Sequence, residues 1–328
     1  MPLLSAWKFA PAPWLTGFDR STLDTVLETD LHEAEKKTFE NPAFSVKCVW
    51  DARNYFAADL FARISLSDRE DQKLNLVLPS PHDAVYVSAA ENLNKFKVNL
   101  RNVNIFFFDE YANENNEVAP PDSPVSRSGR FMKNFYGRLA PELRMKEEQI
   151  CFWTTENAAD YSKLLEDAGG ADVIYADTTW TGLRYIDPDG FAADTMDGYL
   201  ALGSRIVTPA EEQMAFDSLR GMFGNSGDIA NVPPRTATIG PKDIAAAKLT
   251  LTYEYMSAAH GMNVLQQPAL KLALFGPVGP QNPGSLLRLF PGTVYISDTV
   301  ASNTVFRPDV PWLEETINEI RKQEAERR

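Results

Sequence analysis

Apolar positions along the chain recur with two different periods, and segments of the two kinds alternate. Short apolar runs typical of half-buried or fully buried strands occur at 44–50, 74–80, 102–111, 169–177, 270–277 and 293–298. Apolar residues at helical spacing fill the intervals 52–65, 85–96, 130–139 and 241–260. Strands that alternate with helices predict an α/β fold of Rossmann-like type, in which a mostly parallel sheet is covered by helices on both faces.

The two ends of the chain fall outside this alternation. Residues 1–42 open with a proline-rich stretch and continue as a charged helix to about Glu40, after which Pro42 prevents further helix. Residues 311–328 have the pattern of an amphipathic helix. We therefore predict an N-terminal extension over 1–42 and a single α/β domain over 43–328 that finishes in this helix.

Charge and composition narrow the range of partners and settings. The 328 residues include 32 Lys and Arg against 45 Asp and Glu, a net charge of −13, which repels nucleic acid. No apolar run approaches the roughly 20 residues that a membrane-spanning helix needs. Cys48 and Cys151 are the only cysteines, too few for a disulfide scaffold. These features favour a cytoplasmic protein that binds neither nucleic acid nor membranes.

The alternating pattern also predicts where a ligand binds. In open α/β sheets, ligands bind beyond the carboxyl ends of the strands. That rule selects residues 78–84, 109–111 and 177–188 as the candidate site. A dinucleotide fingerprint and a His, Cys and carboxylate cluster at ligand spacing are both missing from the sequence, so we expect no nucleotide cofactor and no metal.

Several segments, in order, resemble one family of sugar-phosphate enzymes. Asp109, Glu110 and Tyr111 end a Phe-rich strand, as in the Asp-Glu-Tyr signature of glucosamine-6-phosphate deaminases; the related 6-phosphogluconolactonases usually have Asp-Glu-Arg there. Residues 169–177 resemble the strand before the family's Gly-Asp-Gly-His loop, and 232–248 resemble its Val-Pro-x-x-Ala-x-Thr-x-Gly segment. The chain thus resembles the glucosamine-6-phosphate deaminase/isomerase family over most of its length.

The resemblance implies roles for the acidic pair. In the family the Asp of this signature removes the C2 proton of the substrate, so Asp109 is the candidate base and Glu110 a candidate substrate contact. A carboxylate at the end of a Phe-rich strand is partly desolvated, which suits a base. The competing interpretation of Asp109 is a helix cap or a solvated turn residue.

The ring-opening loop of the family is only partly present. The chain has ADTTWTGLRYIDP where the family has a Gly-His loop, so Thr181 and Gly182 are candidate contacts and Asp187 a candidate carboxylate. The His of the family is replaced by Leu183, or is deleted if one gap is allowed in the match. His82 is the histidine that falls in a predicted site loop, either as an exposed loop residue or as a replacement acid/base or phosphate contact.

The phosphate loop of the family also differs. Its glycine-rich turn is replaced by LPSPHD, in which Ser80 keeps a hydroxyl donor and Pro81 removes an amide donor. Arg220 resembles the family's phosphate-binding arginine if one inserted residue is allowed. These residues predict a weak phosphate site.

Two hypotheses about function follow from the match and its departures. The first is an aldose–ketose isomerase or deaminase acting on a sugar or sugar phosphate by proton transfer between C2 and C1, with no cofactor. The second is a non-catalytic sugar or sugar-phosphate binding protein that kept the fold without the ring-opening His. A lactonase is a third alternative, although that chemistry also relies on the Gly-His loop. By resemblance we also expect a homo-oligomer.

Overall fold

The main sheet has seven parallel strands and forms the centre of the molecule. The computed structural model describes residues 20–79, 83–176, 195–209, 211–218, 227–255, 263–280, 282–302 and 311–326. The strands lie in the spatial order β1 (Phe44–Val49), β10 (Gly292–Ser297), β9 (Thr250–Glu254), β6 (Val173–Ala176), β2 (Leu74–Leu78), β3 (Val103–Phe107) and β5 (Ile150–Cys151). The predicted α/β class with a mostly parallel sheet is confirmed.

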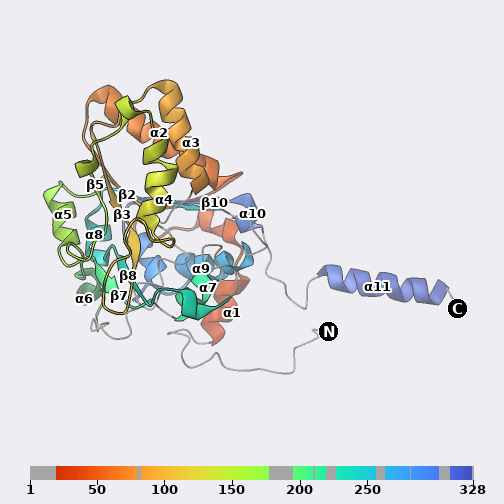
Figure 1. Cartoon of the computed structure of the whole chain (residues 1–328). Coiled ribbons are helices and arrows are strands. Elements are labelled where there is room, and N and C mark those ends of the chain that lie inside the picture. The colour runs from red at the N-terminus through yellow and green to blue at the C-terminus, as the bar shows by residue number, and fades with distance from the viewer. Residues whose placement is uncertain are drawn as a thin grey trace.

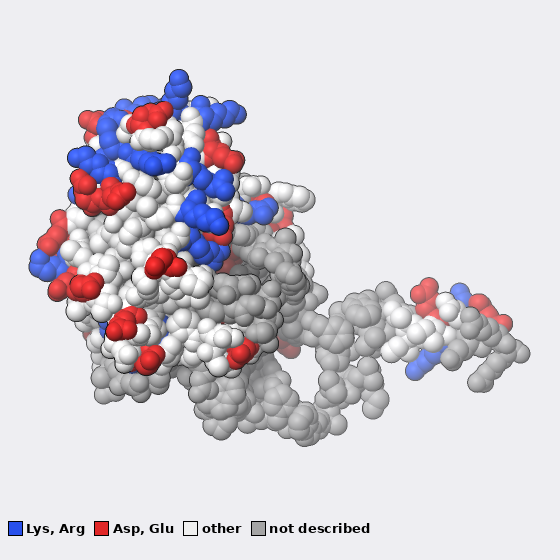
Figure 2. Space-filling view, in the orientation of Figure 1, with Lys and Arg blue, Asp and Glu red and all other residues white. Residues whose placement is uncertain are grey.

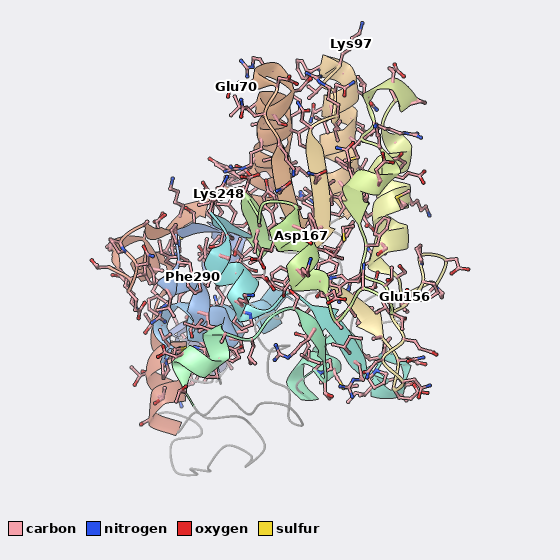
Figure 3. All side chains as sticks on the ribbon, turned by 90° about the vertical axis from the view of Figure 1, so that its left-hand side faces the viewer. Glu70, Lys97, Glu156, Asp167, Lys248 and Phe290 are labelled. Carbon is pink, nitrogen blue, oxygen red and sulfur yellow. The ribbon has the colours of Figure 1, made fainter. Side chains whose placement is uncertain are left out.

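A second, antiparallel sheet of three strands was not predicted. Its strands lie in the order β4 (Asp109–Ala112), β8 (Arg235–Thr238) and β7 (Arg205–Val207). The predicted strand 102–111 is therefore two strands, β3 in the main sheet and β4 in the small one. In Figure 3, Glu70 and Lys97, which lie just before β2 and β3, are at the top, and the small sheet is at the opposite end. The small sheet thus lies where the strands of the main sheet end.

Helices cover both faces of the main sheet. Contacts join α2 to α3 and α3 to α4, and these helices lie together in Figure 1. Right-handed crossovers that run back across the sheet place α5, α8 and α9 on the other face. The helices are α1 (Arg20–Glu28), α2 (Ala52–Glu70), α3 (Asp83–Phe96), α4 (Arg127–Asn134), α5 (Tyr161–Asp167), α6 (Met196–Leu200), α7 (Glu211–Ser218), α8 (Pro241–Ala246), α9 (Asn263–Phe275), α10 (Asp298–Ala301) and α11 (Pro311–Glu326). Short 3-10 helices are Leu31–Lys36, Tyr136–Arg138, Pro141–Leu143, Glu147–Gln149, Ile229–Asn231 and Pro283–Leu289.

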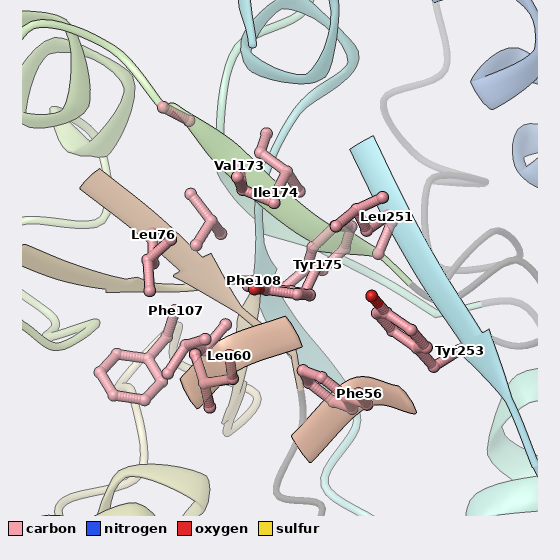
Figure 4. Close-up of a cluster of buried hydrophobic side chains, with 14 of the residues drawn as sticks. Phe56, Leu60, Leu76, Phe107, Phe108, Val173, Ile174, Tyr175, Leu251 and Tyr253 are labelled. Atoms are coloured by element: carbon pink, nitrogen blue, oxygen red, sulfur yellow. The ribbon is translucent and has the colours of Figure 1, made fainter. Parts of the chain in front are cut away.

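Aromatic and branched side chains fill the space between α2 and the sheet. Figure 4 shows Phe56 and Leu60 of α2 against Tyr175 and Tyr253 of the central strands. The Phe56 ring stacks on that of Tyr253 with centroids 4.9 Å apart. Because β2 and β6 are buried on both faces, their sequences are mostly apolar, and these apolar runs made the two strands predictable.

Two segments differ from the prediction. The predicted helix 241–260 ends after α8, and Thr250–Glu254 is a central strand because its β-branched and aromatic residues fit a pleated, buried surface. The predicted strand 270–277 is the last part of α9, where Leu270 and Leu274 are buried one helical turn apart. Leu, Ala and Lys are strong helix formers, which explains why this short apolar run is helical.

The predicted N-terminal extension is partly built into the core. The helix expected to run to Glu40 stops at Glu28, and a 3-10 helix capped by Asp30 follows. Leu31 and Ala34 are fully buried in the main hydrophobic cluster. The boundary of the extension at residue 42 stays a prediction.

The C-terminal amphipathic helix is present as α11. It lies away from both sheets in Figure 1, and its described side chains are exposed or half-buried. Among the helices that the structure describes, none is long and apolar enough to cross a membrane.

Charged side chains are distributed unevenly over the face shown in Figure 2. Lys and Arg are most frequent at the end of the molecule where α2 and α3 meet the amino ends of β2 and β3, and acidic residues stand among them there. Fewer charged residues, mostly acidic, are scattered over the rest of this face. The net charge of −13 therefore does not describe every part of the surface.

A network of hydrogen bonds around Asp243 connects the small sheet to α8. The Asp243 carboxylate in the first turn of α8 accepts from Ser162 Oγ and Ser204 Oγ, each at 2.6 Å, and Gly240 N donates to Ser204 Oγ at 3.1 Å. Gly240 is tightly packed there, because a Cβ added to it would lie 2.2 Å from the carbonyl carbon of Gly203. The segment before β7 and the segment after β8 therefore meet backbone to backbone.

We predict that Gly240→Ala destabilises the protein by about 1–3 kcal/mol, the usual cost of overpacking, because the new methyl group meets backbone that cannot rotate away. Chemical denaturation measures this. Ala245→Ser, at an exposed position of the same helix, is the control and should change stability by less than about 0.5 kcal/mol. Equal stability of the two variants would contradict the close packing.

Candidate functional site

The candidate site is built where the chain leaves the main sheet. Phe107, the last residue of β3, donates its backbone N–H to Tyr161 Oη at 2.9 Å, and its carbonyl accepts from Trp153 Nε1 at 2.8 Å. Phe108 N donates to Leu78 O at 2.7 Å, and Phe108 O accepts from Ile239 N at 2.8 Å. Main-chain hydrogen bonds thus pass from the large sheet to the small one at Phe108 and hold the two residues that follow it.

Glu110 is fully buried and caps the N-terminus of α4. Its carboxylate accepts hydrogen bonds from the backbone N–H of Arg127 and of Ser128, at 3.0 and 2.9 Å, and from the Ser128 hydroxyl at 2.9 Å. Ser126 Oγ and Tyr111 N donate to it as well. A buried carboxylate at a helix N-terminus satisfies orphan N–H groups there and is favoured by the helix dipole. The observed role of Glu110 is therefore to join β4 to α4.

Burial dominates the acidity of this group. Removal from water raises the pKa of Glu110 from its usual 4.5 to about 7, although the hydrogen bonds from Ser128, Tyr111 and Ser126 act in the opposite direction. Glu110 therefore changes its protonation state near neutral pH.

Asp109 is paired with Arg127 inside the protein. Arg127 Nη1 forms an ion pair with Asp109 Oδ1, and both side chains are at most 2% exposed. The Arg127 guanidinium carbon lies 4.3 Å from the centre of the Tyr111 ring, a cation–π arrangement. Asp109, Tyr111 and Arg127 therefore form one buried group on a single face of β4.

The strand register extends this face across the small sheet. Asp109 lies opposite Thr238, and Tyr111 lies opposite Thr236. Directly opposed residues of antiparallel strands point to the same face of the sheet. Two threonines therefore share the face that carries Asp109 and Arg127.

Of the predicted site residues, the structure places two. Asp109 and Glu110 lie side by side after β3 as predicted, on opposite faces of β4. Six lie outside the described residues: Ser80, His82, Thr181, Gly182, Asp187 and Arg220. Whether they approach Asp109 stays a prediction.

The described residues offer no cluster for a metal ion. Among them, no group of three or more His, Cys, Asp or Glu side chains is arranged to hold one. The charged residues that the structure places together at the site are Asp109, Glu110 and Arg127, and of these Arg127 was not predicted from the sequence.

Solved structures of sugar-phosphate enzymes share this arrangement of strands and helices. A monomeric glucosamine-6-phosphate deaminase matches with a TM-score of 0.61 and 17% identity, over 78% of this chain and 98% of that one. The 6-phosphogluconolactonase of Thermotoga maritima matches with a TM-score of 0.53 and 13% identity, over 77% and 98% of the two chains. That of Trypanosoma brucei matches with a TM-score of 0.52 and 16% identity, over 82% and 100%. No family model matches the sequence.

The chain has the fold of these deaminases and lactonases. The resemblance inferred from the Asp-Glu-Tyr signature and the segments around it is confirmed at the level of the fold, which is what a likeness at these identities establishes. The fold match covers nearly the whole length of each of these solved structures.

Sequence reasoning missed Arg127 and Thr236. Arg127 lies in a proline- and serine-rich stretch where Ser126 is a recognisable N-cap residue, and this cap is formed: Ser126 Oγ accepts from Gly129 N at 3.1 Å. The Ser126 cap predicts where α4 starts. It does not predict that the side chain of the next residue, Arg127, pairs with Asp109.

We predict a pH-dependent stability that Glu110→Gln removes. Because the folded-state pKa is raised to about 7, the folded protein holds a proton between about pH 4.5 and 7 that the unfolded chain releases. The contribution of Glu110 to stability therefore falls as pH rises through this window, by up to about 1.4 kcal/mol per pH unit, and is level above it.

The measurement is the free energy of unfolding of both proteins from pH 4.5 to 8. As pH rises from 4.5 to 7, the free energy of unfolding of the wild type should fall relative to that of Glu110→Gln. A difference that is constant with pH, or that favours the wild type as pH rises, would contradict the raised pKa.

Proposed function

We propose that this chain is an enzyme of the isomerase or deaminase type that acts on a sugar phosphate, with Asp109 as the base. The observation that supports this most strongly is the position of Asp109, two residues after the end of β3, at the carboxyl edge of the main sheet where ligands bind in such folds. The fold likeness to a glucosamine-6-phosphate deaminase adds to it.

The chemistry that follows is a proton transfer within the substrate. The Asp109 carboxylate takes the proton from C2 of the open-chain sugar, and the same carboxyl returns a proton to C1. From a sugar with a hydroxyl group on C2 the intermediate is an enediol, which gives the ketose. From a 2-amino sugar it is an enolamine, which gives the imine at C2; water then adds to C2, and ammonia leaves as the ketose forms. No redox partner or cofactor is needed, because the electrons stay within the substrate.

A second function is favoured by a different observation. Asp109 is buried and engaged with Arg127, so a substrate reaches it only when the covering side chains give way. A protein that binds sugar phosphate without turning it over would keep this ion pair closed. Non-catalytic binding is therefore the alternative that the burial of Asp109 supports.

The two functions differ in one exchange reaction. We predict that the wild type in D₂O deuterates C2 of glucosamine 6-phosphate, observed by ¹H NMR, and that Asp109→Asn lowers this rate by about 10²–10⁴-fold, the usual contribution of a general base. Asp122→Asn is the matched control, since Asp122 is an exposed aspartate in the loop before α4, and it should keep the wild-type rate.

If the wild type binds the sugar phosphate but does not exchange its C2 proton, the protein is a non-catalytic binding protein and not an enzyme. Equal exchange by Asp109→Asn and the wild type would remove Asp109 from the role of base, whatever the activity.

A further inference from the structure

Arg127 is a buried arginine whose hydrogen-bonding capacity is only partly used. Its backbone N–H donates to Glu110, and its Nη1 forms the ion pair with Asp109. Nη2 is buried and has no hydrogen-bond partner among the described residues. Leaving a charged donor buried and unpaired is costly, so such a group calls for a further partner.

Arg288 shows how this chain builds an arginine that is purely structural. It is 3% exposed, comparable to the 2% of Arg127. Its Nη1 donates to the carbonyls of Ala273 and Gly276 at 3.1 and 2.9 Å, and its Nε donates to Glu40 at 2.9 Å. The second terminal nitrogen also pairs with Glu40. Every nitrogen of Arg288 is thus engaged, and Arg127 is different.

A second unsatisfied polar atom lies on the same face of the small sheet. Thr236 is 1% exposed, and its Oγ1 has no hydrogen-bond partner among the described residues. Thr236 lies directly opposite Tyr111, and the Arg127 guanidinium rests on the Tyr111 ring. A guanidinium donor and a hydroxyl donor therefore flank one aromatic ring.

Helix α7 packs next to this face of the small sheet and carries a further buried polar side chain. Its Met214 packs against the cluster of Tyr111 and Val232. The preceding residue, Gln213, is fully buried with Oε1 unpartnered among the described residues.

We propose that Arg127 Nη2 and the Thr236 hydroxyl bind the phosphate group of the ligand on the face of the small sheet next to Asp109. A guanidinium fork and a hydroxyl donor match the geometry and charge of phosphate oxygens. The choice of phosphate over another oxyanion rests on the proposed function. This site stands in for the glycine-rich phosphate loop that the sequence lacks, and Asp109 beside it weakens phosphate binding by charge repulsion.

The test is binding of inorganic phosphate to the full chain, by isothermal titration calorimetry at constant ionic strength. Arg127→Gln should weaken binding about tenfold or more, and Thr236→Val several-fold, because each removes one donor. Arg288→Gln is the control matched in burial and should bind phosphate as the wild type does. Asp109→Asn should bind phosphate several-fold more tightly, because it removes the repelling charge. A merely structural role of Arg127 does not produce this gain.

Several results would overturn the proposal: no phosphate binding by the wild type, unchanged binding by a folded Arg127→Gln, or weaker binding by Asp109→Asn. If Arg127→Gln does not fold, Thr236→Val and Asp109→Asn decide between the outcomes. The result is independent of catalysis. Arg127-dependent phosphate binding without C2 exchange would uphold this site and reject the enzyme, and C2 exchange with Arg127-independent binding would do the reverse.

Discussion

The buried carboxylates of Asp109 and Glu110 are the constraint on which the arrangement of the site depends. Two adjacent acidic residues are carried into the interior at the point where the chain passes from the large sheet to the small one. The cost of burying each carboxylate is compensated differently. Glu110 accepts hydrogen bonds from the first turn of α4, and Asp109 forms an ion pair with the Arg127 side chain of the same turn. Breaking a buried pair by removing one partner typically costs about 3–5 kcal/mol. The position of α4 and the charge state of the site are therefore set together.

Because of this coupling, the first turn of α4 contributes both to the stability of the fold and to the charge at the site. The backbone of Arg127 serves Glu110 and the fold, while its side chain serves Asp109 and any ligand that approaches it. A change in either carboxylate is felt at the same residue. The small sheet is also tied to α8 through Ser204, Gly240 and Asp243, at the end of its strands where Asp109 lies opposite Thr238. The end of the sheet that carries Asp109 is thus fixed to both α4 and α8.

The fold was predictable from the sequence where a buried strand is also apolar. Strands such as Leu74–Leu78 read as nearly continuous apolar runs because both of their faces are covered. The short apolar run at 270–277 suits a strand or a helix, and residues 270–275 are helical. The strand Thr250–Glu254 was missed because two threonines and a glutamate interrupt its apolar residues, although all five residues are buried. The small sheet was missed because Arg235–Thr238 has one charged and two hydroxyl side chains, which resemble a loop in isolation.

The site was predictable as far as Asp109 and Glu110, which stand in a recognisable motif. Arg127 and Thr236 meet that motif only through tertiary contacts, which local patterns do not encode.

The chain combines the fold of sugar-phosphate enzymes with a closed Asp109–Arg127 pair, and this pair is the proposed binding site of the sugar phosphate. A crystal structure with glucosamine 6-phosphate tests it most directly. Binding at this pair places C2 of the sugar next to the Asp109 carboxylate and its phosphate within hydrogen-bonding distance of Arg127 Nη2 and Thr236 Oγ1. A sugar phosphate bound elsewhere, with the ion pair still closed and covered, would contradict it.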